Sequence, residues 1–325
     1  MQLSMATAEQ IKALIKSHAH NDTEHFFAIA LQIAAHEARN GHTALASFIR
    51  DQYDRTQSKK RQEQDEKASD LPEKLVGLLT HAIPSHQNNQ LVVPHAVRNR
   101  LDRIICEYQE RDKLASFDLT YRRKLLLFGP SGTGKTMTAH VLASRLRLPL
   151  YIVSLDSILS KYVGESSAKL HLVFDFIHTQ KAVFLFDEFD SIAGDRSNGD
   201  DVGEMRRLLN TLLLCIEGDD SKSYILAATN KPELIDNALF RRFDDIIKYS
   251  LPGEAERKLL IQNTLASFCP DAFDFDYLVQ ASTELNCAII TRACTDAIKS
   301  ALMSGHYQVS KEGVLAAINE RKPQF

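Results

Sequence analysis

The octapeptide GPSGTGKT, Gly129 to Thr136, has the residue types and spacing of a phosphate-binding loop. It matches the pattern G-x-x-x-x-G-K-[ST], in which glycines let backbone amides converge on phosphate oxygens without side-chain clashes. In this pattern Lys135 can reach the β- and γ-phosphates, and the Thr136 hydroxyl can hold Mg²⁺. The loop lies between the apolar run 124–128 and the helical segment MTAHVLASRL, whose N-terminus adds a favourable dipole. A glycine-rich turn without a ligand is the alternative, but this strand–loop–helix context favours a nucleotide site.

The residues expected to contact ATP are those of the loop and the residue that follows it: Gly129, Pro130, Ser131, Gly132, Thr133, Gly134, Lys135, Thr136 and Met137.

Two adjacent acids follow the apolar run of the segment AVFLFDEFD, Ala182 to Asp190. Asp187 is placed to complete the Mg²⁺ shell, and Glu188 can orient and polarise a water toward the γ-phosphate. Acids at a buried strand end are unfavourable unless a cation or a water chain uses them. Alone this is a weak pattern, but its position downstream of a phosphate-binding loop strengthens the prediction of a hydrolytic site.

A third apolar strand, in ILAATN, ends in Asn230, which could hydrogen-bond the attacking water or the γ-phosphate. An asparagine that ends a strand in a turn is the common alternative. Further on, ALFRRFDD places Arg241 and Arg242 side by side. Arginine suits phosphate through its planar set of donors, although an isolated pair is more often a surface feature.

Five short apolar runs predict the sheet that positions these residues: 124–129, 149–153, 182–186, 224–229 and 245–250. The runs are continuously apolar and alternate with helical segments, which is typical of parallel strands buried on both faces. We therefore expect an α/β fold of the P-loop NTPase type, with a five-stranded parallel sheet covered by helices. Residues 75–250 would form this nucleotide-binding domain, and the helical patterns after it predict an all-helical lid over 251–325.

The N-terminal part of the chain predicts a small helical bundle over residues 1–54, followed by a charged linker over 55–74. The bundle is rich in histidine, but no ligand spacing supports a metal site: His18, His20, His25, His36 and His42. His36-Glu37 begins a zinc-protease pattern, yet Asn40 stands where its second histidine is required. Recruitment of a substrate or an adaptor is the default expectation for this bundle.

Composition and charge narrow the class of protein. The net charge of −3 gives no general attraction to nucleic acid or anionic membranes, so no nucleic-acid partner is expected. Five cysteines without C-x-x-C spacing indicate reduced thiols of an intracellular protein. No secretory signal and no apolar run near the length of a membrane helix is present, so we expect a cytoplasmic protein without a membrane segment.

Taken in order, GPSGTGKT, KYVGES, VFLFDEFD, AATN and ALFRRFDD resemble the motifs of the AAA+ ATPases, and specifically the AAA subgroup, over about residues 75–305. The resemblance implies that Lys135 and Thr136 are the Walker A pair, and that Asp187 and Glu188 are the Walker B metal ligand and general base. It also implies that Asn230 is sensor 1, that Arg242 acts on a neighbouring subunit's ATP with Arg241 as the second choice, and that Ala288 lies at the nucleotide edge of the lid.

The resemblance further implies a hexameric ring with a central pore. The segment KYVG would line that pore and grip an extended polypeptide: Lys161, Tyr162, Val163 and Gly164. A buried tyrosine at a helix entry is the structural alternative. The loop before Arg207, which contains Asp200 and Asp201, resembles a second pore loop, although these acids could equally be solvated charges.

The sequence departs from the family pattern at two places. Asp245 stands where many members carry a second arginine, and Asn286 to Ile289 replace the usual Ser-Gly-Ala-Asp of the lid. The function implied is an ATP-dependent unfoldase or remodelling chaperone, working alone or with a separate protease or adaptor. Two alternatives stay open: a nucleic-acid translocase or loader, and a nucleotide-switched assembly factor. The mostly apolar KYVG argues against the first, and the intact Glu188 argues against the second.

Overall fold

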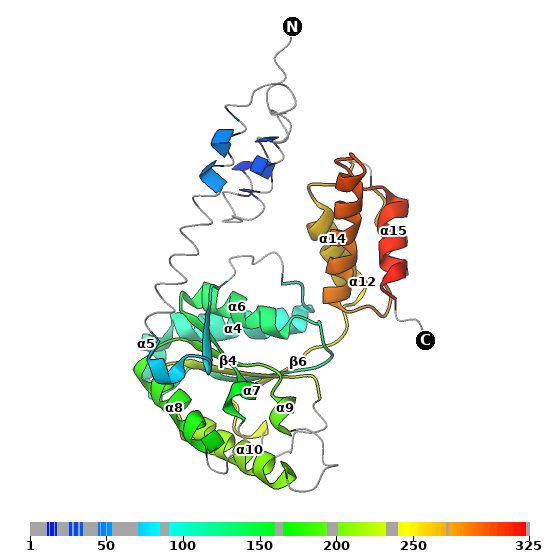
Figure 1. Cartoon of the computed structure of the whole chain (residues 1–325). Helices are drawn as coiled ribbons and strands as arrows, with labels where there is room; N and C mark the ends of the chain where they lie inside the picture. The colour runs from blue at the N-terminus through cyan, green and yellow to red at the C-terminus, as the bar shows by residue number, and fades with distance from the viewer. Residues whose placement is uncertain are drawn as a thin grey trace. The chain divides into compact units, whose positions relative to one another are not determined.

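The structure is a computed structural model (Figure 1). It describes residues 71–84, 91–159, 165–193, 201–231, 240–270 and 273–322, together with individual positions between 12 and 53. The chain forms two compact units. The first contains Met1–Leu71 and Ser85–Gln87, and the second contains Pro72–Pro84 and Asn88–Phe325. The predicted boundaries at 54, 74 and 250 stay predictions.

The first unit is helical at its described positions, which fall within 12–17, 26–34 and 45–53. Ile29, Ile33 and Ala34 are buried there. The Phe27 ring packs edge-on against Phe26 and Tyr53, each with ring centroids 5.5 Å apart. The histidines singled out in the sequence of this unit lie outside the described residues.

The second unit is built on a sheet that has six strands within the described residues, in the order β1-β3-β4-β5-β2-β6. The strands are β1 (Leu79–Ala82), β2 (Lys124–Phe128), β3 (Leu150–Val153), β4 (Val183–Phe186), β5 (Tyr224–Thr229) and β6 (Asp245–Lys248). The five strands predicted from the apolar runs are parallel, so the α/β fold class is confirmed. The predicted count of five is wrong by one edge strand, because β1 pairs antiparallel with β3. Its sequence, LTHA, is short and half polar, as an edge strand can be.

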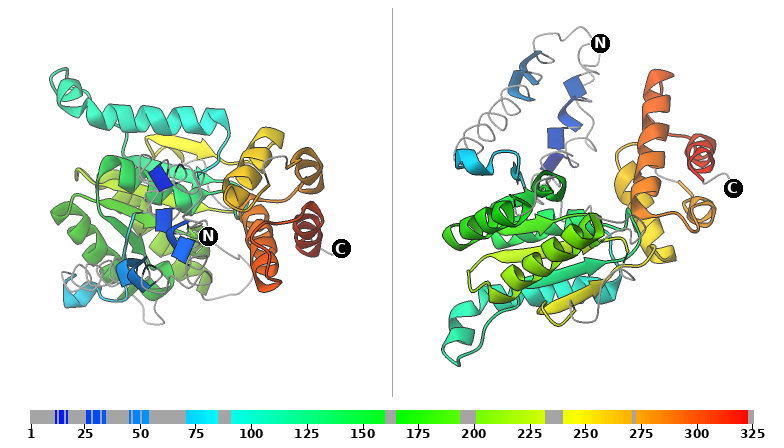
Figure 2. Two further views of the ribbon diagram at one scale, coloured as in Figure 1. Left: turned by 90° about the horizontal axis from the view of Figure 1, so that it is seen from above. Right: turned by 60° about the horizontal axis from the view of Figure 1, so that its bottom comes forward.

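The central strands are buried on both faces, which explains their continuously apolar sequences. In β2, Leu125, Leu126 and Leu127 are fully buried, and every residue of β4 and β5 is buried as well. Figure 1 shows α4 and α6 on one face of the sheet and α7, α8, α9 and α10 on the other. Seen from above, α4 lies alongside β6 (Figure 2).

The described helices that accompany the sheet have the following bounds: α4 (His95–Gln109), α5 (Arg111–Ala115), α6 (Lys135–Leu146), α7 (Leu155–Ile158), α8 (Glu165–Thr179), α9 (Asp190–Ala193) and α10 (Asp201–Gly218). The short 3-10 helix η1 (Glu73–Leu75) precedes the first strand.

After β6 the segment Leu251-Pro252-Gly253 leads into a group of helices with its own apolar core. They are α12 (Glu254–Leu265), α13 (Asp276–Ala281), α14 (Cys287–Met303) and α15 (Lys311–Glu320). Asn286 caps α14 by accepting a hydrogen bond from the Ile289 amide, and Ser310 caps α15 by accepting from the Gly313 amide. These caps fix where the two helices begin, and the start of α14 faces the loop after β2.

No helix within the described ranges is long and apolar enough to cross a membrane. The five cysteines are free thiols.

Candidate functional site

The polar residues predicted to act together follow three neighbouring parallel strands. β4, β5 and β2 lie side by side in the sheet, and the chain leaves each of them at the same edge. Asp187 and Glu188 follow β4, Asn230 follows β5, and the loop from Gly129 follows β2. The topology therefore brings residues that are far apart in sequence to one edge of the sheet, where α/β proteins bind ligands.

The loop after β2 depends on glycines with positive φ. Gly129, Gly132 and Gly134 have φ of 142°, 71° and 101°. A Cβ on Gly129 would lie 2.2 Å from the carbonyl oxygen of Tyr249, and a Cβ on Gly132 would lie 2.7 Å from the Asn286 side chain. The loop can therefore approach both the end of β6 and the start of α14, which larger residues would prevent.

Lys135 is buried inside the loop, with 6% of its surface exposed. Its ammonium group donates to the carbonyl oxygens of Gly129 and Pro130, both at 2.8 Å, and to Oδ1 of Asn230 at 2.7 Å. Burial lowers the pKa of Lys135, and the nearby carboxylates of Asp187 and Asp190 oppose that shift. The loop thus holds a cation whose partners are mainly neutral oxygens.

Thr136 and Asp187 meet at the side of the loop, where the threonine hydroxyl donates to Oδ2 of Asp187 at 2.6 Å. Oδ1 of the same carboxylate accepts from the Glu188 amide at 2.9 Å. A hydroxyl and a carboxylate in contact are hard oxygen donors of the kind Mg²⁺ prefers, so this pair fits the predicted metal site. Within the residues that the structure describes, no larger cluster of metal-ligating side chains is present.

Glu188 has a left-handed backbone, with φ of 49°, and an exposed side chain. The turn is held on both sides: the Glu188 carbonyl accepts from Ser191 N at 2.7 Å, and Phe189 N donates to Ala228 O at 2.8 Å. Phe189 is fully buried below the turn. A non-glycine residue in this conformation is uncommon and persists where the surroundings determine it.

Two residues that help to shape the site were not identified from the sequence. Oδ1 of Asp190 accepts from the Thr229 hydroxyl at 3.0 Å and from the Asn230 amide at 3.2 Å. The signal available was its place as the last acid of DEFD, at the same strand end as Asp187.

The second is Tyr249, a fully buried residue just after β6. The Thr138 hydroxyl donates to Gly134 O at 2.9 Å, so the Tyr249 hydroxyl is the donor in their 2.6 Å contact. This pair ties the end of β6 to α6 beneath the loop, and no local pattern in the sequence indicates it.

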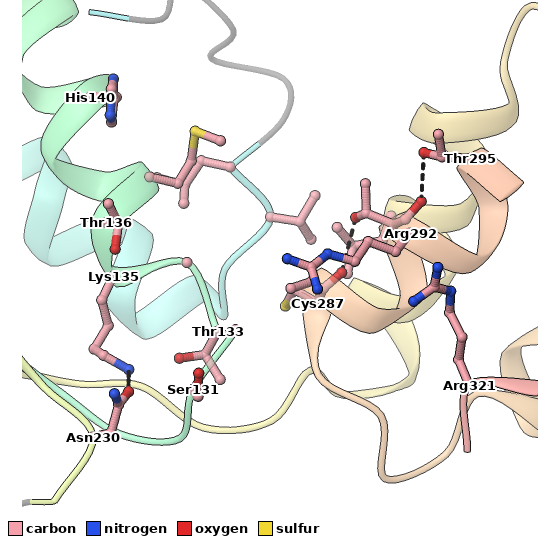
Figure 3. Close-up of a pocket in the computed structure, with 18 of the residues that line it drawn as sticks. Ser131, Thr133, Lys135, Thr136, His140, Asn230, Cys287, Arg292, Thr295 and Arg321 are labelled. Carbon is pink, nitrogen blue, oxygen red and sulfur yellow. Dashed lines mark hydrogen bonds between the residues drawn. The ribbon is translucent and has the colours of Figure 1, made fainter. Parts of the chain in front are cut away.

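A pocket of about 860 Å³ opens between the loop and the helices α14 and α15 (Figure 3). The apolar residues that line it include Leu91, Val92, Met137, Leu260 and Ala288. These side chains suit the flat face of a purine, while the loop side offers polar groups for phosphates. The Ala288 amide donates to the Gly132 carbonyl at 3.0 Å, so the lid and the loop are joined by a backbone hydrogen bond.

The lid also contributes polar side chains to the pocket, and Figure 3 shows Arg292 extending toward the loop from that side, with Arg321 beside it. Arg321 is paired with Asp296, which also lies near Lys299. The loop residues Ser131, Gly132, Thr133, Gly134, Lys135, Thr136 and Met137 line the same pocket, as do Asp187, Glu188, Asn230 and Ala288. The structure therefore brings the predicted metal ligands, Lys135, Glu188, Asn230 and most of the predicted nucleotide-binding residues to one site. Among the described residues, Gly129, Pro130 and the arginine pair do not line the pocket.

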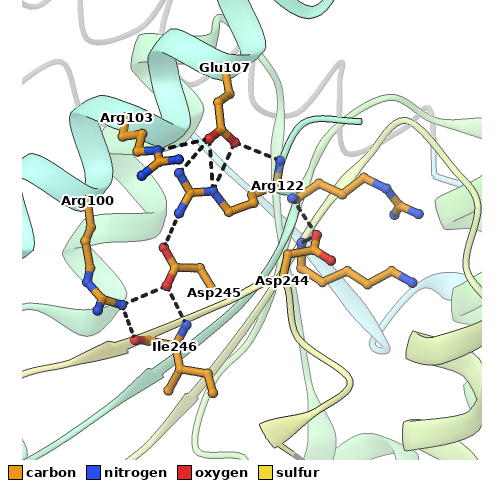
Figure 4. Close-up of polar contacts among 9 residues, drawn as sticks. Arg100, Arg103, Glu107, Arg122, Asp244, Asp245 and Ile246 are labelled. Atoms are coloured by element: carbon orange, nitrogen blue, oxygen red, sulfur yellow. Dashed lines mark hydrogen bonds and ion pairs between the residues drawn. The ribbon is translucent and has the colours of Figure 1, made fainter. Parts of the chain in front are cut away.

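Arg241 and Arg242 are not among the described residues that line the pocket. Arg241 is exposed, whereas Nε of Arg242 lies 3.3 Å from a carboxylate oxygen of Glu217 at the end of α10. Asp245, which replaces an expected arginine, pairs with Arg100 at 2.7 Å and with Arg122 at 2.8 Å (Figure 4). This departure from the family pattern thus has a structural role between α4 and β6.

The segment predicted to line a pore, Lys161 to Gly164, lies outside the described residues, as does Asp200. Asp201 is the first residue of α10.

Comparisons with known proteins agree with this site. Residues 125–251 match the family model described as ATPase family associated with various cellular activities (AAA). An uncharacterised AAA family ATPase of Sinorhizobium fredii, y4kL, is 32% identical over 324 residues, which is 97% of this chain and 96% of that protein.

Two further relatives match over part of their length. A 26S proteasome regulatory subunit homolog of Methanothermobacter marburgensis is 32% identical over 204 residues, 61% of this chain and 55% of that protein. The human peroxisomal ATPase PEX1 is 37% identical over 190 residues, 56% of this chain and 14% of that protein. The chain therefore spans nearly the whole of the first relative but only about half of the second and a small part of the third.

Proposed function

This chain belongs to the AAA family of ATPases, and on that premise we propose that it uses ATP hydrolysis to remodel proteins. The proposed assembly is a hexameric ring that threads a polypeptide through its centre. ATP hydrolysis itself is the activity of this family. The observation that carries the proposed mechanism is that Lys135, Thr136, Asp187, Glu188 and Asn230 surround one pocket.

Each of these side chains has a chemical task in hydrolysis. The loop amides and Lys135 would bind the β- and γ-phosphates, so a phosphate oxygen would replace one of the acceptors that now hold the Lys135 ammonium. Thr136 and Asp187 would hold Mg²⁺, which supplies positive charge beside the phosphates when bound. Glu188 would accept a proton from the attacking water. The water oxygen would bond to the γ-phosphorus as the bond between that phosphorus and ADP breaks.

The position of the arginine pair supports the proposed ring. Arg241 and Arg242 are on the same chain as the pocket but, among the described residues, do not line it. An arginine supplied by a neighbouring copy would complete the positive charge around the γ-phosphate. We propose Arg242 for this role, with Arg241 as the second choice, and its contact with Glu217 would have to open on assembly.

A polypeptide client is supported by the relatives and by the sequence of the proposed pore segment. One relative bears the name of a 26S proteasome regulatory subunit homolog, and this name supports a protein client for the present chain. Tyr162 and Val163 would grip an extended chain without sequence preference through apolar and π contacts. A separate protease or adaptor as a partner, and a cytoplasmic location, belong to the same proposal.

The ATPase part is tested with the purified full-length protein, ATP and Mg²⁺. Phosphate release and light scattering should show turnover and a nucleotide-dependent ring. Glu188→Gln should still bind ATP while turnover falls about 100-fold or more. Titrating Arg242→Ala into wild type should lower the activity of the mixture more steeply than simple dilution. A protein that turns over ATP as a monomer would contradict the ring.

The client part is tested with a folded fluorescent domain that carries an extended unstructured tail. Wild type should unfold this domain with ATP, whereas Tyr162→Ala should keep its ATPase activity and lose unfolding. Normal unfolding by Tyr162→Ala would remove the pore interpretation. Strong stimulation of ATPase activity by single-stranded DNA, with no effect of the tailed protein, would favour a nucleic-acid translocase instead.

A further inference from the structure

We propose that Asp190 is a positioning residue for ATP hydrolysis, which fixes Asn230 relative to Glu188 and the phosphate loop. The inference rests on the family's ATPase activity and is independent of the polypeptide client. Three successive links carry it: a contact from Asp190 to β5, a contact from Asn230 to Lys135, and the anchoring of the turn that contains Glu188.

The first link joins the end of β4 to the end of β5. Oδ1 of Asp190 accepts from the Thr229 hydroxyl at 3.0 Å and from the backbone amide of Asn230 at 3.2 Å. Thr229 is fully buried, and its hydroxyl oxygen also accepts from the Lys231 amide at 3.1 Å. One carboxylate oxygen therefore sets the backbone position of Asn230 just where β5 ends.

The second link sets the orientation of the Asn230 amide group. An ammonium can only donate, so the side-chain atom 2.7 Å from Nζ of Lys135 is the carbonyl oxygen of Asn230. The NH₂ group of Asn230 is then the part of the amide that can donate to a phosphate oxygen or to a water. Asp190 thus determines where the Asn230 side chain begins, and Lys135 determines which way it faces.

The third link fixes Asp190 itself and includes Glu188. Phe189 is fully buried, and its amide donates to Ala228 O at 2.8 Å. Asp190 follows it directly, so residues 189 and 190 both bond to β5, and Glu188 is the residue immediately before this clamp. The left-handed φ of Glu188 is maintained by the same turn. A displacement of Asp190 would therefore change the distance between the two side chains expected to orient the attacking water.

A double-mutant cycle separates this role from a purely structural one. ATP turnover and nucleotide dissociation constants are measured for wild type, Asp190→Ala, Asn230→Ala and the double variant, all as full-length protein. Asp190→Ala should lower kcat about 10-fold to 100-fold, the expected effect of losing a charged hydrogen-bond acceptor, while the nucleotide Kd changes less than about 3-fold. In the Asn230→Ala background, the same substitution should lower kcat less than about 3-fold.

Additive effects in the cycle would overturn the proposal, because a residue that acts through Asn230 has little left to do once Asn230 is removed. An equal loss of nucleotide affinity and kcat would overturn it as well, since that would indicate a collapsed site. Asp112→Ala, at an exposed carboxylate of α5, is the matched control and should leave kcat unchanged.

Two conservative variants keep the test valid if Asp190→Ala does not fold. Asp190→Asn retains an oxygen at the position of Oδ1, so it should recover most of the wild-type kcat. Asp190→Glu retains the charge but displaces the oxygens by one methylene, so it should lower kcat about 10-fold. Wild-type kcat in Asp190→Glu, or an Asp190→Asn variant as inactive as Asp190→Ala, would overturn the proposal.

Discussion

The charged residues near the start of β2 and β6 neutralise one another, whereas Lys135, at the start of α6 beyond the carboxyl end of β2, is held by uncharged oxygens. At the start, Arg122 binds Glu107 at 2.6 Å and Asp245 at 2.8 Å, as Figure 4 shows. At the other end, Lys135 donates to two carbonyls and one amide oxygen. A network of ion pairs therefore lies near one end of these strands, and beyond the other end lies a cation that has no direct charge partner among the described residues.

The pKa shifts of the two cations have opposite signs. Hydrogen bonding to Glu107 raises the pKa of Arg122, so the surroundings favour its charged form. Burial lowers the pKa of Lys135, so the surroundings disfavour its charge. A buried cation of this kind is stabilised by an anionic ligand such as a phosphate. The ion pairs of Arg122 therefore hold the fold together, whereas the surroundings of Lys135 are arranged to bind a ligand.

The largest effect that would test this difference is expected for Lys135→Ala. Turnover should fall about 1,000-fold or more, because the variant loses the charge that binds the β- and γ-phosphates. The melting temperature should change by no more than about 2 °C, since Lys135 makes no ion pair with any residue that the structure describes. Phosphate release and calorimetry measure the two quantities. A large drop in melting temperature with turnover preserved would show that the comparison is wrong.

Arg122→Ala should give the reverse pattern. The free energy of unfolding should fall by roughly 2 kcal/mol, because Glu107 and Asp245 lose their shared partner while partly buried. The KM for ATP and kcat should stay within about 2-fold of wild type. Urea unfolding and steady-state kinetics check both. Arg103→Ala is the matched control: this arginine is 73% exposed, and within the described part of the chain its one ion pair is with Glu107. The substitution should therefore lower the free energy of unfolding by less than about 0.5 kcal/mol.

Tyr249→Phe probes the connection between the end of β6 and the loop. Removal of its hydroxyl leaves Thr138 with one hydrogen bond fewer, so the free energy of unfolding should fall by about 1 kcal/mol. Because Thr138 also donates to the Gly134 carbonyl of the loop, nucleotide affinity should weaken slightly as well. Urea unfolding with and without ADP separates the two effects. Unchanged stability would mean that the Tyr249 hydroxyl contributes nothing to the end of β6.

The smallest effect is the dependence of the ion-pair network on acid. Hydrogen bonds from Arg122 hold the pKa of Glu107 below its ordinary value of 4.5. A carboxyl with a depressed pKa stabilises the fold above its unfolded pKa, and this stabilisation is lost as the pH falls through the folded pKa. Glu107→Gln should therefore be less stable than wild type by about 1 kcal/mol at pH 7, with a smaller difference near pH 4. A difference that widens in acid would contradict the assignment.

The sequence predicted those features whose cause is local. The five parallel strands were recognisable because burial on both faces makes them continuously apolar, and the loop after β2 because its glycines and Lys135 have a fixed spacing. The positions of Asp187, Glu188 and Asn230 at strand ends followed from the same pattern. Their assembly at one edge requires only that the strands be parallel.

Other features depend on contacts between distant parts of the chain. The short strand β1 exists because it pairs with β3, and nothing in LTHA alone predicts it. Asp190 contacts Thr229 across 39 positions, and Asp245 contacts Arg100 across 145 positions. The sequence indicated only that Asp245 stands where many family members carry an arginine. Its role in the network became visible once α4 was found beside β6.

The hydrogen bond from the Ala288 amide to the Gly132 carbonyl would link ATP hydrolysis to movement of the lid in the remodelling function that we propose. Gly132 also packs closely against Asn286, the cap of α14, so the loop and the start of α14 are in tight contact. A rotation of the lid about the start of α14 must either break the bond or pull the phosphate loop with it. In the proposed cycle, a rotation of the lid would therefore move the loop that binds the triphosphate, and loss of the terminal phosphate would in turn free the lid to rotate.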